Sequence, residues 1–302
     1  MQPVVPKSPA EWFNAAAQLW ANSHGAPTLT IWLRDQDSIR RGIAEEVFRE
    51  LQPLSTPVDE LWVMLNSVGG DLNGAYQIAR RLQSTAKTVR VVIPRMAKSA
   101  ATLITLGCHE VVMHPLAELG PIDTQTDVLR AGKRMMRSTL DVMRSIEYLR
   151  EFAMNSYVRV AKFLVDYSAT TPYQLPIEQA TPSAATVMNA LVEPIFSQID
   201  PIQMAECYRL LDVSREYGRR LMSVSYTTMA EGKREDLLSK MAEGYPAHGF
   251  IIDFKEAEEL GLRSREATPD ERTLLDFGVI FAGDRVRSIK LYQPQPAPVA
   301  DR

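Results

Sequence analysis

The alternation of short apolar runs with amphipathic helical periods over residues 29–113 constrains the fold more than any other feature. Four runs have the length and the β-branched content of strands, and they cover residues 29–33, 61–65, 89–93 and 111–113. The helical periods between them cover residues 39–51, 72–82 and 99–106. Strands that alternate with crossover helices build a mostly parallel sheet covered by helices, so we predict an α/β fold.

The pattern changes after Asp123, and β alternation is almost absent from there to about residue 242. We predict helices at residues 131–167, 183–199 and 201–222, with a proline- and threonine-rich break at 170–182. A strand at 250–252 and a helix at 254–260 follow. The predicted organisation is a first core segment, a large helical insertion, a closing core segment and a loose tail, at residues 1–126, 127–243, 244–292 and 293–302.

Residues 130–150 carry six basic and two acidic side chains. Two interpretations stay open: an ordinary solvated helix face, or a docking surface for an acidic partner.

The charge balance limits the classes of partner. Lys and Arg number 34 against 37 Asp and Glu, for a formal net charge of −3, whereas binding to nucleic-acid phosphates usually needs a strong basic excess. We therefore expect no nucleic-acid partner. Cys108 and Cys207 stand far apart and suggest no disulfide framework. Neither a secretory segment nor a membrane-length apolar run is visible, so we expect a cytoplasmic protein without membrane contact.

Metal and phosphate motifs are absent from the sequence. His109, Glu110 and His114 resemble the zinc signature H-E-x-x-H, but one extra residue would place the two imidazoles about 140° apart on a helix. We interpret both histidines as residues at the ends of a strand and expect no metal. Gly69, Gly70 and other glycines form neither a dinucleotide-binding nor a P-loop fingerprint, so we expect no cofactor.

Two segments about thirty residues apart combine into a more specific pattern. Residues 65–71 end a predicted strand with Gly69 and Gly70, which allow positive φ and leave backbone N–H groups unscreened, as an oxyanion site requires. Residues 94–101 lead from the next strand into a short helix that begins near Ser99. The small neighbouring residues leave the Ser99 hydroxyl accessible to a substrate, and a helix N-terminus favours the negative charge that develops there. A serine at this point can also be a simple N-cap.

Together these segments resemble the Clp-type peptidase fold of the crotonase superfamily. Residues 66–71, 93–102 and 119–123 are more closely similar to the serine dehydrogenase proteinase family, and the resemblance covers residues 27–126 and, more weakly, 244–262. It implies a ββα spiral, a serine peptidase acting on peptides or proteins, and a homo-oligomer. It also implies Ser99 as nucleophile, with an oxyanion hole formed by the N–H of Gly69 or Gly70 and that of Ala100. Whether an unfoldase partner is needed stays open.

The general base is a separate question. The resemblance implies a triad in the order Ser99, Asp123, His248, which contains a hydroxyl, a carboxylate and an imidazole. Lys133 is an alternative base, as in Ser-Lys hydrolases, whereas Lys98 would project about 100° away from Ser99 on a helix. Asp123 could instead cap a helix, and His248 could merely enter a strand. Two other functions stay open: an acyl-thioester enzyme of the crotonase type, and an inactive scaffold.

Overall fold

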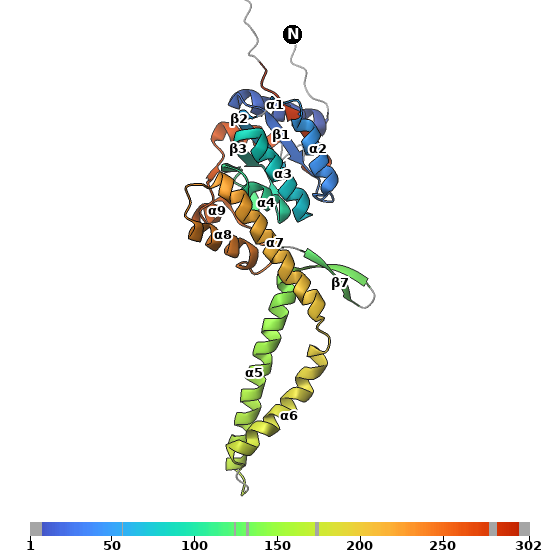
Figure 1. Ribbon diagram of the computed structural model, residues 1–302, viewed down its shortest axis with the longest axis vertical. Helices are drawn as coiled ribbons and strands as arrows, with labels where there is room; N and C mark the ends of the chain where they lie inside the picture. The colour runs from blue at the N-terminus through green and yellow to red at the C-terminus, as the bar shows by residue number, and fades with distance from the viewer. Residues whose placement is uncertain are drawn as a thin grey trace, which may run out of the picture. The chain divides into compact units, whose positions relative to one another are not determined.

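The computed structural model describes residues 8–55, 57–123, 125–130, 133–172, 175–277 and 283–295, with only the backbone for 125–130, 133–137 and 277 (Figure 1). The chain forms two compact units. The first unit contains Met1–Thr124 together with Leu211–Arg302, and the second contains Gln125–Leu210.

A six-stranded sheet forms the centre of the first unit, in the order β10-β1-β2-β3-β5-β9. Its strands are β1 (Thr28–Trp32), β2 (Val58–Asn66), β3 (Ala86–Ile93), β5 (Glu110–Met113), β9 (Ser264–Glu266) and β10 (Ser288–Tyr292). All neighbours pair in parallel except β10, which is antiparallel to β1. The predicted α/β class with a mainly parallel sheet is confirmed, and so are the four strands predicted from apolar runs.

Helices cover both faces of this sheet (Figure 1). The helices α2 (Arg41–Leu51), α3 (Leu72–Thr85) and α4 (Ala100–Leu106) pack on one face, and α1 (Pro9–His24) and α10 (Pro269–Phe277) on the other. Successive side chains of a strand point to opposite faces. In β2, Val63 therefore joins the larger core with α2 to α4, while Trp62 and Met64 join the smaller core with α1.

A second, two-stranded sheet lies beyond the carboxyl end of β3. It pairs β4 (Met96–Ala97) in parallel with β6 (Glu118–Leu119), and Ser67, one residue after β2, bridges to Ala97. Loops at the carboxyl ends of parallel strands are the usual location of functional groups in open α/β sheets. The two segments singled out in the sequence are therefore joined by backbone pairing.

The helices after residue 210 belong to the first unit. They are the last part of α7 (Pro201–Ser225), then α8 (Glu231–Glu243), α9 (Phe254–Glu259) and α10. The second unit is therefore shorter than the helical region 127–243 predicted from the sequence. The reason is packing, because apolar side chains such as Leu221, Leu238 and Met241 are buried in the larger core.

The predicted strand at 250–252 is wrong. Only Ile252 pairs with another segment, through an isolated antiparallel bridge to Leu119. Asp253 ends this extended segment because its side chain accepts from the amide of Glu256 and caps α9. The sheet strand supplied by this part of the chain is β9 instead. In the predicted tail, Gln293 accepts from Gln18 of α1 through its carbonyl, and residues 296–302 lie outside the described residues.

The second unit contains the hairpin of β7 (Gln125–Arg130) and β8 (Lys133–Ser138), the helices α5 (Thr139–Ala169) and α6 (Ile177–Phe196), and the start of α7. The predicted helix start at residue 131 is wrong, because β8 runs to Ser138, whose side chain caps α5. The predicted break at 170–182 ends early, since α6 already begins at Ile177 and contains Pro182.

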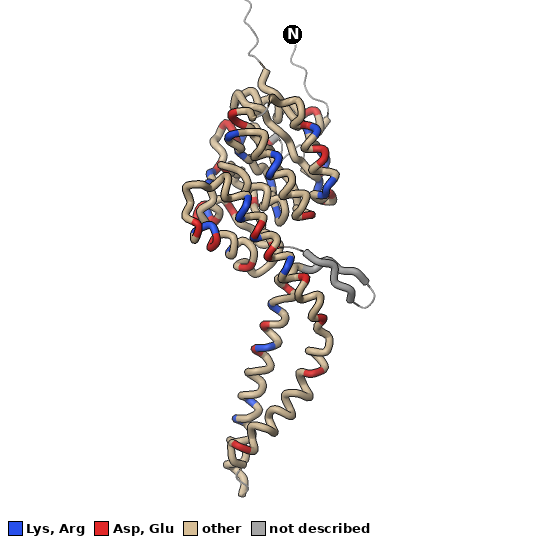
Figure 2. The backbone as a smooth tube through the Cα atoms, viewed as in Figure 1, with Lys and Arg blue, Asp and Glu red and all other residues tan. Residues whose placement is uncertain are grey.

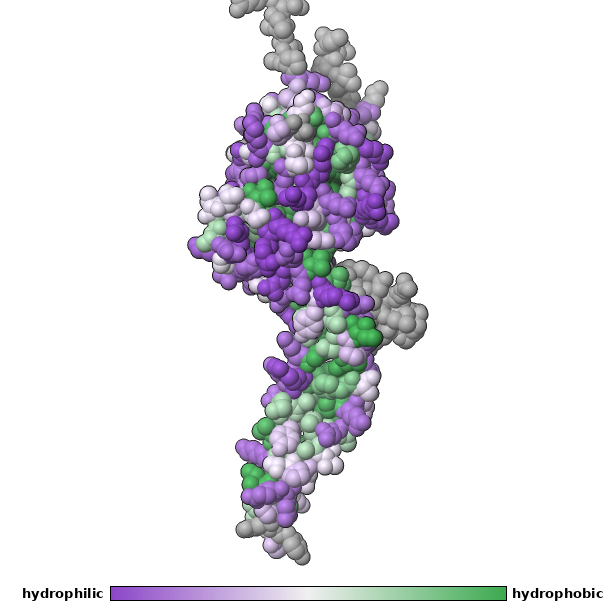
Figure 3. Space-filling view, in the orientation of Figure 1, coloured by the Kyte–Doolittle hydropathy of each residue, from purple (hydrophilic) through white to green (hydrophobic). Residues whose placement is uncertain are grey.

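Large apolar side chains remain exposed on the second unit (Figure 3). Those on α5 and α6 are Tyr148, Phe152, Met154, Val158, Phe163, Tyr167, Ile177, Val187, Leu191, Ile195 and Phe196. Charges are sparse on α6, where Glu178 and Glu193 are the only charged residues (Figure 2). The side chains of Arg130, Lys133, Arg134 and Arg137 lie outside the described residues, so the two interpretations of the basic stretch stay open. Among described residues, no helix combines the length and apolarity needed to cross a membrane.

Candidate active site

Ser99 is held in an unusual backbone conformation between β4 and α4. Its φ is 50° and its ψ is −118°, and it is the one described residue other than glycine with positive φ. Such a conformation costs on the order of 1–3 kcal/mol and persists only where the surroundings impose it. The side chain makes no capping hydrogen bond to the helix, so the N-cap interpretation does not apply. Ser99 therefore stands on a strained turn and is 7% exposed.

The turn after β2 packs directly against this serine. Gly69 has a φ of 102°, and a Cβ placed on it would lie 2.6 Å from the carbonyl oxygen of Lys98 and 2.9 Å from the Cβ of Ser99. Gly70 has a φ of 143°, and its Cβ would lie 2.3 Å from the carbonyl oxygen of Ile39. Both positions exclude any side chain. Gly69 therefore lets this turn approach the backbone of Lys98 and Ser99, and Gly70 lets it approach the backbone of Ile39.

The backbone N–H groups of the diglycine turn and of the start of α4 differ in their hydrogen bonds. The N–H of Gly69 donates to the side-chain oxygen of Ser67, at 3.0 Å. The N–H groups of Gly70 and Ala100 have no hydrogen-bond acceptor among the described residues. Of the two glycines that the sequence left as alternatives, Gly70 is thus the one with an unused donor in this structure. Unused donors close to a serine hydroxyl can stabilise an oxyanion.

Asp123 and His248 are brought together. Their Oδ1 and Nδ1 atoms lie 2.7 Å apart, and the Asp123 side chain is fully buried while that of His248 is 22% exposed. A histidine whose Nδ1 donates to a carboxylate carries its acceptor lone pair on Nε2. Asp123 also contacts the serine, because its main-chain carbonyl accepts from the Ser99 hydroxyl at 3.3 Å. No hydrogen bond joins Ser99 and His248 in the part of the chain that the structure describes.

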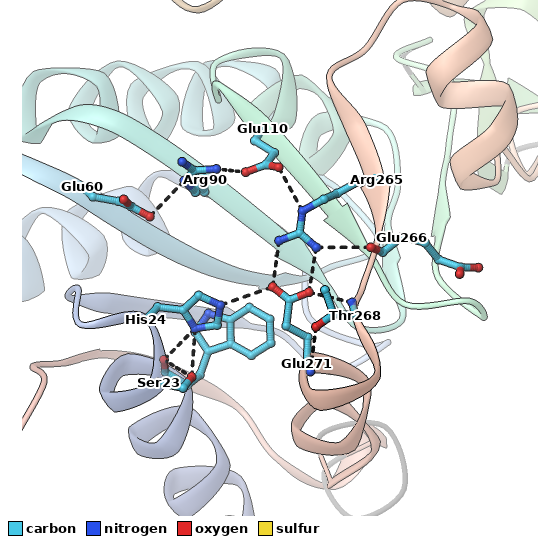
Figure 4. Close-up of polar contacts among 10 residues, drawn as sticks. Ser23, His24, Glu60, Arg90, Glu110, Arg265, Glu266, Thr268 and Glu271 are labelled. Atoms are coloured by element: carbon cyan, nitrogen blue, oxygen red, sulfur yellow. Dashed lines mark hydrogen bonds and ion pairs between the residues drawn. The ribbon is translucent and has the colours of Figure 1, made fainter. Parts of the chain in front are cut away.

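The other three histidines have structural contacts. His109 and His114 lie at opposite ends of β5, as the sequence predicts. His109 accepts from the amide of Val89, and His114 contacts Asp276. His24 contacts Glu271 (Figure 4). Within the described ranges, no group of three or more His, Cys, Asp or Glu residues could hold a metal ion.

Figure 4 shows that Glu271 belongs to a cluster of charged residues that includes Glu60, Arg90, Glu110 and Arg265 on strands β2, β3, β5 and β9. Arg265 donates to both of its carboxylate oxygens, at 2.7 and 2.8 Å, and also to Glu110. Burial would raise the pKa of Glu271, but hydrogen bonds from Arg265 and the amide of Thr268 lower that pKa to about 2. None of the candidate catalytic residues takes part, so this cluster is structural.

Cys108 and Lys133 complete the set of residues with possible chemistry. Burial raises the pKa of the Cys108 thiol to about 12, so this cysteine stays protonated at neutral pH and does not compete as a nucleophile. The backbone of Lys133, the alternative base, lies in β8, but its side chain is outside the described residues. Lys133 therefore stays a prediction.

Comparison with protein families finds a match to part of the chain. Residues 36–147 match the ClpP-like SDH-type serine proteinase family. The resemblance predicted from residues 66–71, 93–102 and 119–123 is confirmed, since all three segments fall within the match. His248 lies outside it, so the case for His248 depends on its contact with Asp123.

Individual proteins are similar to different extents of the chain. An uncharacterized protein of Methanocaldococcus jannaschii is 34% identical over 84 residues, which are 27% of this chain and 28% of that protein. The chain thus spans less than a third of that relative. ClpP1 from Listeria monocytogenes is 16% identical over 81% of this chain and 94% of its own, with a TM-score of 0.41. A 1510-N membrane-bound stomatin-specific protease is 20% identical over 39% of this chain and 59% of its own, with a TM-score of 0.30.

Proposed function

We propose that this protein is a serine peptidase that works through an acyl-enzyme. The Ser99 hydroxyl attacks the carbonyl carbon of a peptide bond while Nε2 of His248 takes its proton. The imidazolium then gives that proton to the leaving amine. Asp123 orients the imidazole and stabilises its charged form. The N–H groups of Ala100 and of the diglycine turn stabilise the tetrahedral oxyanion, and water completes the cycle by attacking the acyl-enzyme.

The contact pattern of Asp123 is the observation that carries this proposal. One fully buried aspartate accepts from the Ser99 hydroxyl with its carbonyl and contacts the His248 ring with its carboxylate. A buried carboxylate is costly unless it is paired, and a pairing with histidine next to a strained serine is the arrangement that acyl transfer needs.

In this structure the Ser99 hydroxyl is in a resting orientation, bound to a carbonyl. Rotation about its Cα–Cβ bond changes the hydrogen-bond acceptor without any backbone movement. Catalytic hydrogen bonds are often absent from free enzymes and form only when substrate is present. We propose that an extended peptide binds beside the diglycine turn by strand addition and favours the active rotamer.

A fluorophosphonate probe tests the proposal directly. The wild type should be labelled at one serine, and Ser99→Ala should abolish the labelling while its thermal unfolding stays close to that of the wild type. Mass spectrometry of the labelled peptide identifies the modified residue. If the wild type is not labelled at any pH at which it is folded, the proposed peptidase activity is ruled out.

An inactive scaffold is the second candidate. Two observations favour it, namely the 7% exposure of Ser99 and the hydrogen bond of its hydroxyl to a carbonyl instead of to His248. In that case wild type and Ser99→Ala are equally unreactive, and Ser99 serves only to shape the turn.

We also propose that the chain forms a homo-oligomer through its second unit. The support is the set of exposed apolar side chains on α5 and α6, because an isolated helical pair in water rarely leaves so many uncovered. A second copy would bury them.

A further inference from the structure

Lys98, the residue before the candidate nucleophile, has a largely buried side chain with specific contacts. Its Nζ lies 3.0 Å from the carboxylate of Glu118, and it donates to the carbonyl oxygens of Leu119 and Phe250 at 3.2 and 3.3 Å. Only 13% of the side chain is exposed. The ammonium group thus donates two hydrogen bonds to carbonyl oxygens, and Glu118 supplies the opposite charge. The buried charge is therefore both paired and hydrogen-bonded.

The path of this side chain is tightly enclosed. A Cβ placed on Gly120 would lie 2.7 Å from Cδ of Lys98, so a glycine at position 120 leaves the room through which the lysine reaches its acceptors. The sequence argument that Lys98 is a poor base for its neighbour agrees with this geometry. Its ammonium group is held by two hydrogen bonds and one ion pair to other segments of the chain.

Those acceptors belong to the two segments that carry the proposed base and its partner. Phe250 is two residues after His248, and Leu119 is four residues before Asp123. Leu119 also exchanges two backbone hydrogen bonds with Ile252, at 2.9 and 3.1 Å. The Lys98 side chain and the Leu119–Ile252 pair therefore both connect the loop of His248 to β6.

We propose that Lys98 is a positioning residue, which fixes the loop of His248 relative to the turn of Ser99. This inference rests on the proposed function. A displacement of about 1 Å in a reacting group can cost on the order of 10²-fold in rate. The lysine and the nucleophile are consecutive residues, so one strained turn sets the positions of both the hydroxyl and the loop that carries the base.

The test uses the full chain with Lys98→Met combined with Glu118→Gln, so that no uncompensated carboxylate is left behind. The readout is the second-order rate of fluorophosphonate labelling at Ser99. We expect a loss of about 10²-fold. Hydrogen exchange of the 246–252 backbone should speed up, while that of α4 stays unchanged. Lys87→Met is the matched control, since its ion pair with Asp59 is exposed.

A double-mutant cycle separates positioning from a merely structural role. Once His248→Ala has removed the base, adding the Lys98→Met and Glu118→Gln changes should lower the labelling rate no further. An equal loss in both backgrounds would overturn the proposal, as would a wild-type labelling rate in the folded Lys98 variant. If instead the wild type is not labelled, or His248→Ala has no effect on its labelling, the proposed function itself fails.

Discussion

The carboxylate of Asp123 lies 2.7 Å from Nδ1 of His248, although 125 residues separate the two in the chain. The second unit, Gln125–Leu210, occupies most of that interval. The two ends of the interval are joined by further pairing, since the amide of Ile122 donates to the carbonyl of Met241 at 2.9 Å. The segments on either side of the second unit are therefore paired in the first unit, and this pairing brings Asp123 into contact with His248.

Asp123→Asn should lower the rate of fluorophosphonate labelling by about 10³- to 10⁴-fold. The amide has the shape of the carboxylate, but it can donate to Nδ1 and thereby leave the proton on Nε2, which then cannot accept from Ser99. Asp253→Asn, the same change at the cap of α9, should leave the labelling rate unchanged. A rate within about threefold of the wild type would contradict the role of Asp123.

Gly69→Ala should destabilise the fold by about 2 kcal/mol or more and slow labelling of Ser99. The added methyl group would meet the Lys98 carbonyl at 2.6 Å, and the φ of 102° disfavours any side chain. Gly42→Ala in α2 is the matched control. Its methyl group would meet nothing within 4 Å, so it should stabilise the helix by up to about 1 kcal/mol. Urea unfolding measures both, and equal effects would contradict the close approach of the two turns.

Glu271→Gln should remove part of the stability at neutral pH. The folded-state pKa of Glu271 is about 2, below its ordinary value of 4.5, so its contribution is complete above pH 4.5 and is lost as the pH falls toward 2. We expect the substitution to lower the free energy of unfolding by about 2 kcal/mol at pH 7, a value that allows for solvent screening of the charges.

Urea unfolding of the Glu271→Gln variant and the wild type between pH 2 and pH 7 checks this. The difference in unfolding free energy should shrink as the pH falls, whereas a constant difference would show that the carboxylate charge is not responsible. Glu259→Gln, an exposed change, should follow the wild type throughout.

Self-association should depend on the exposed aromatic side chains of α5. Phe163 and Tyr167 stack on each other and are 63% and 61% exposed. Changing both to Asn should weaken the oligomer by about tenfold or more in sedimentation experiments, with little effect on the folding of the single chain. Leu116→Asn is the control, since Leu116 is 76% exposed but belongs to the first unit. A wild-type protein that sediments as a monomer would contradict the proposed oligomer.

The sequence predicted the strands and helices that are marked by the pattern of apolar residues within the segment itself. The strands β1, β2, β3 and β5 have apolar runs of strand length, and the helices between them have clear periods. The hairpin of β7 and β8 was not predicted, because its strands lack apolar alternation. The strand β9 was not predicted either, since Ser264–Glu266 is three polar residues, which become a strand by pairing with β5.

Some features of the candidate site follow from neighbouring residues, whereas others depend on distant parts of the chain. The positions of Gly69, Gly70 and Ser99 beside strand ends are readable from the order of residues, because turn chemistry depends on near neighbours. The pairing of His248 with Asp123 was implied only by the family resemblance and not by any local pattern. The φ of 50° at Ser99 and the acceptors of Lys98 are not readable from the sequence. Each depends on segments distant in the chain that meet only after the sheet has formed. Contact geometry at a distance is set by packing of the whole core, which no local pattern encodes.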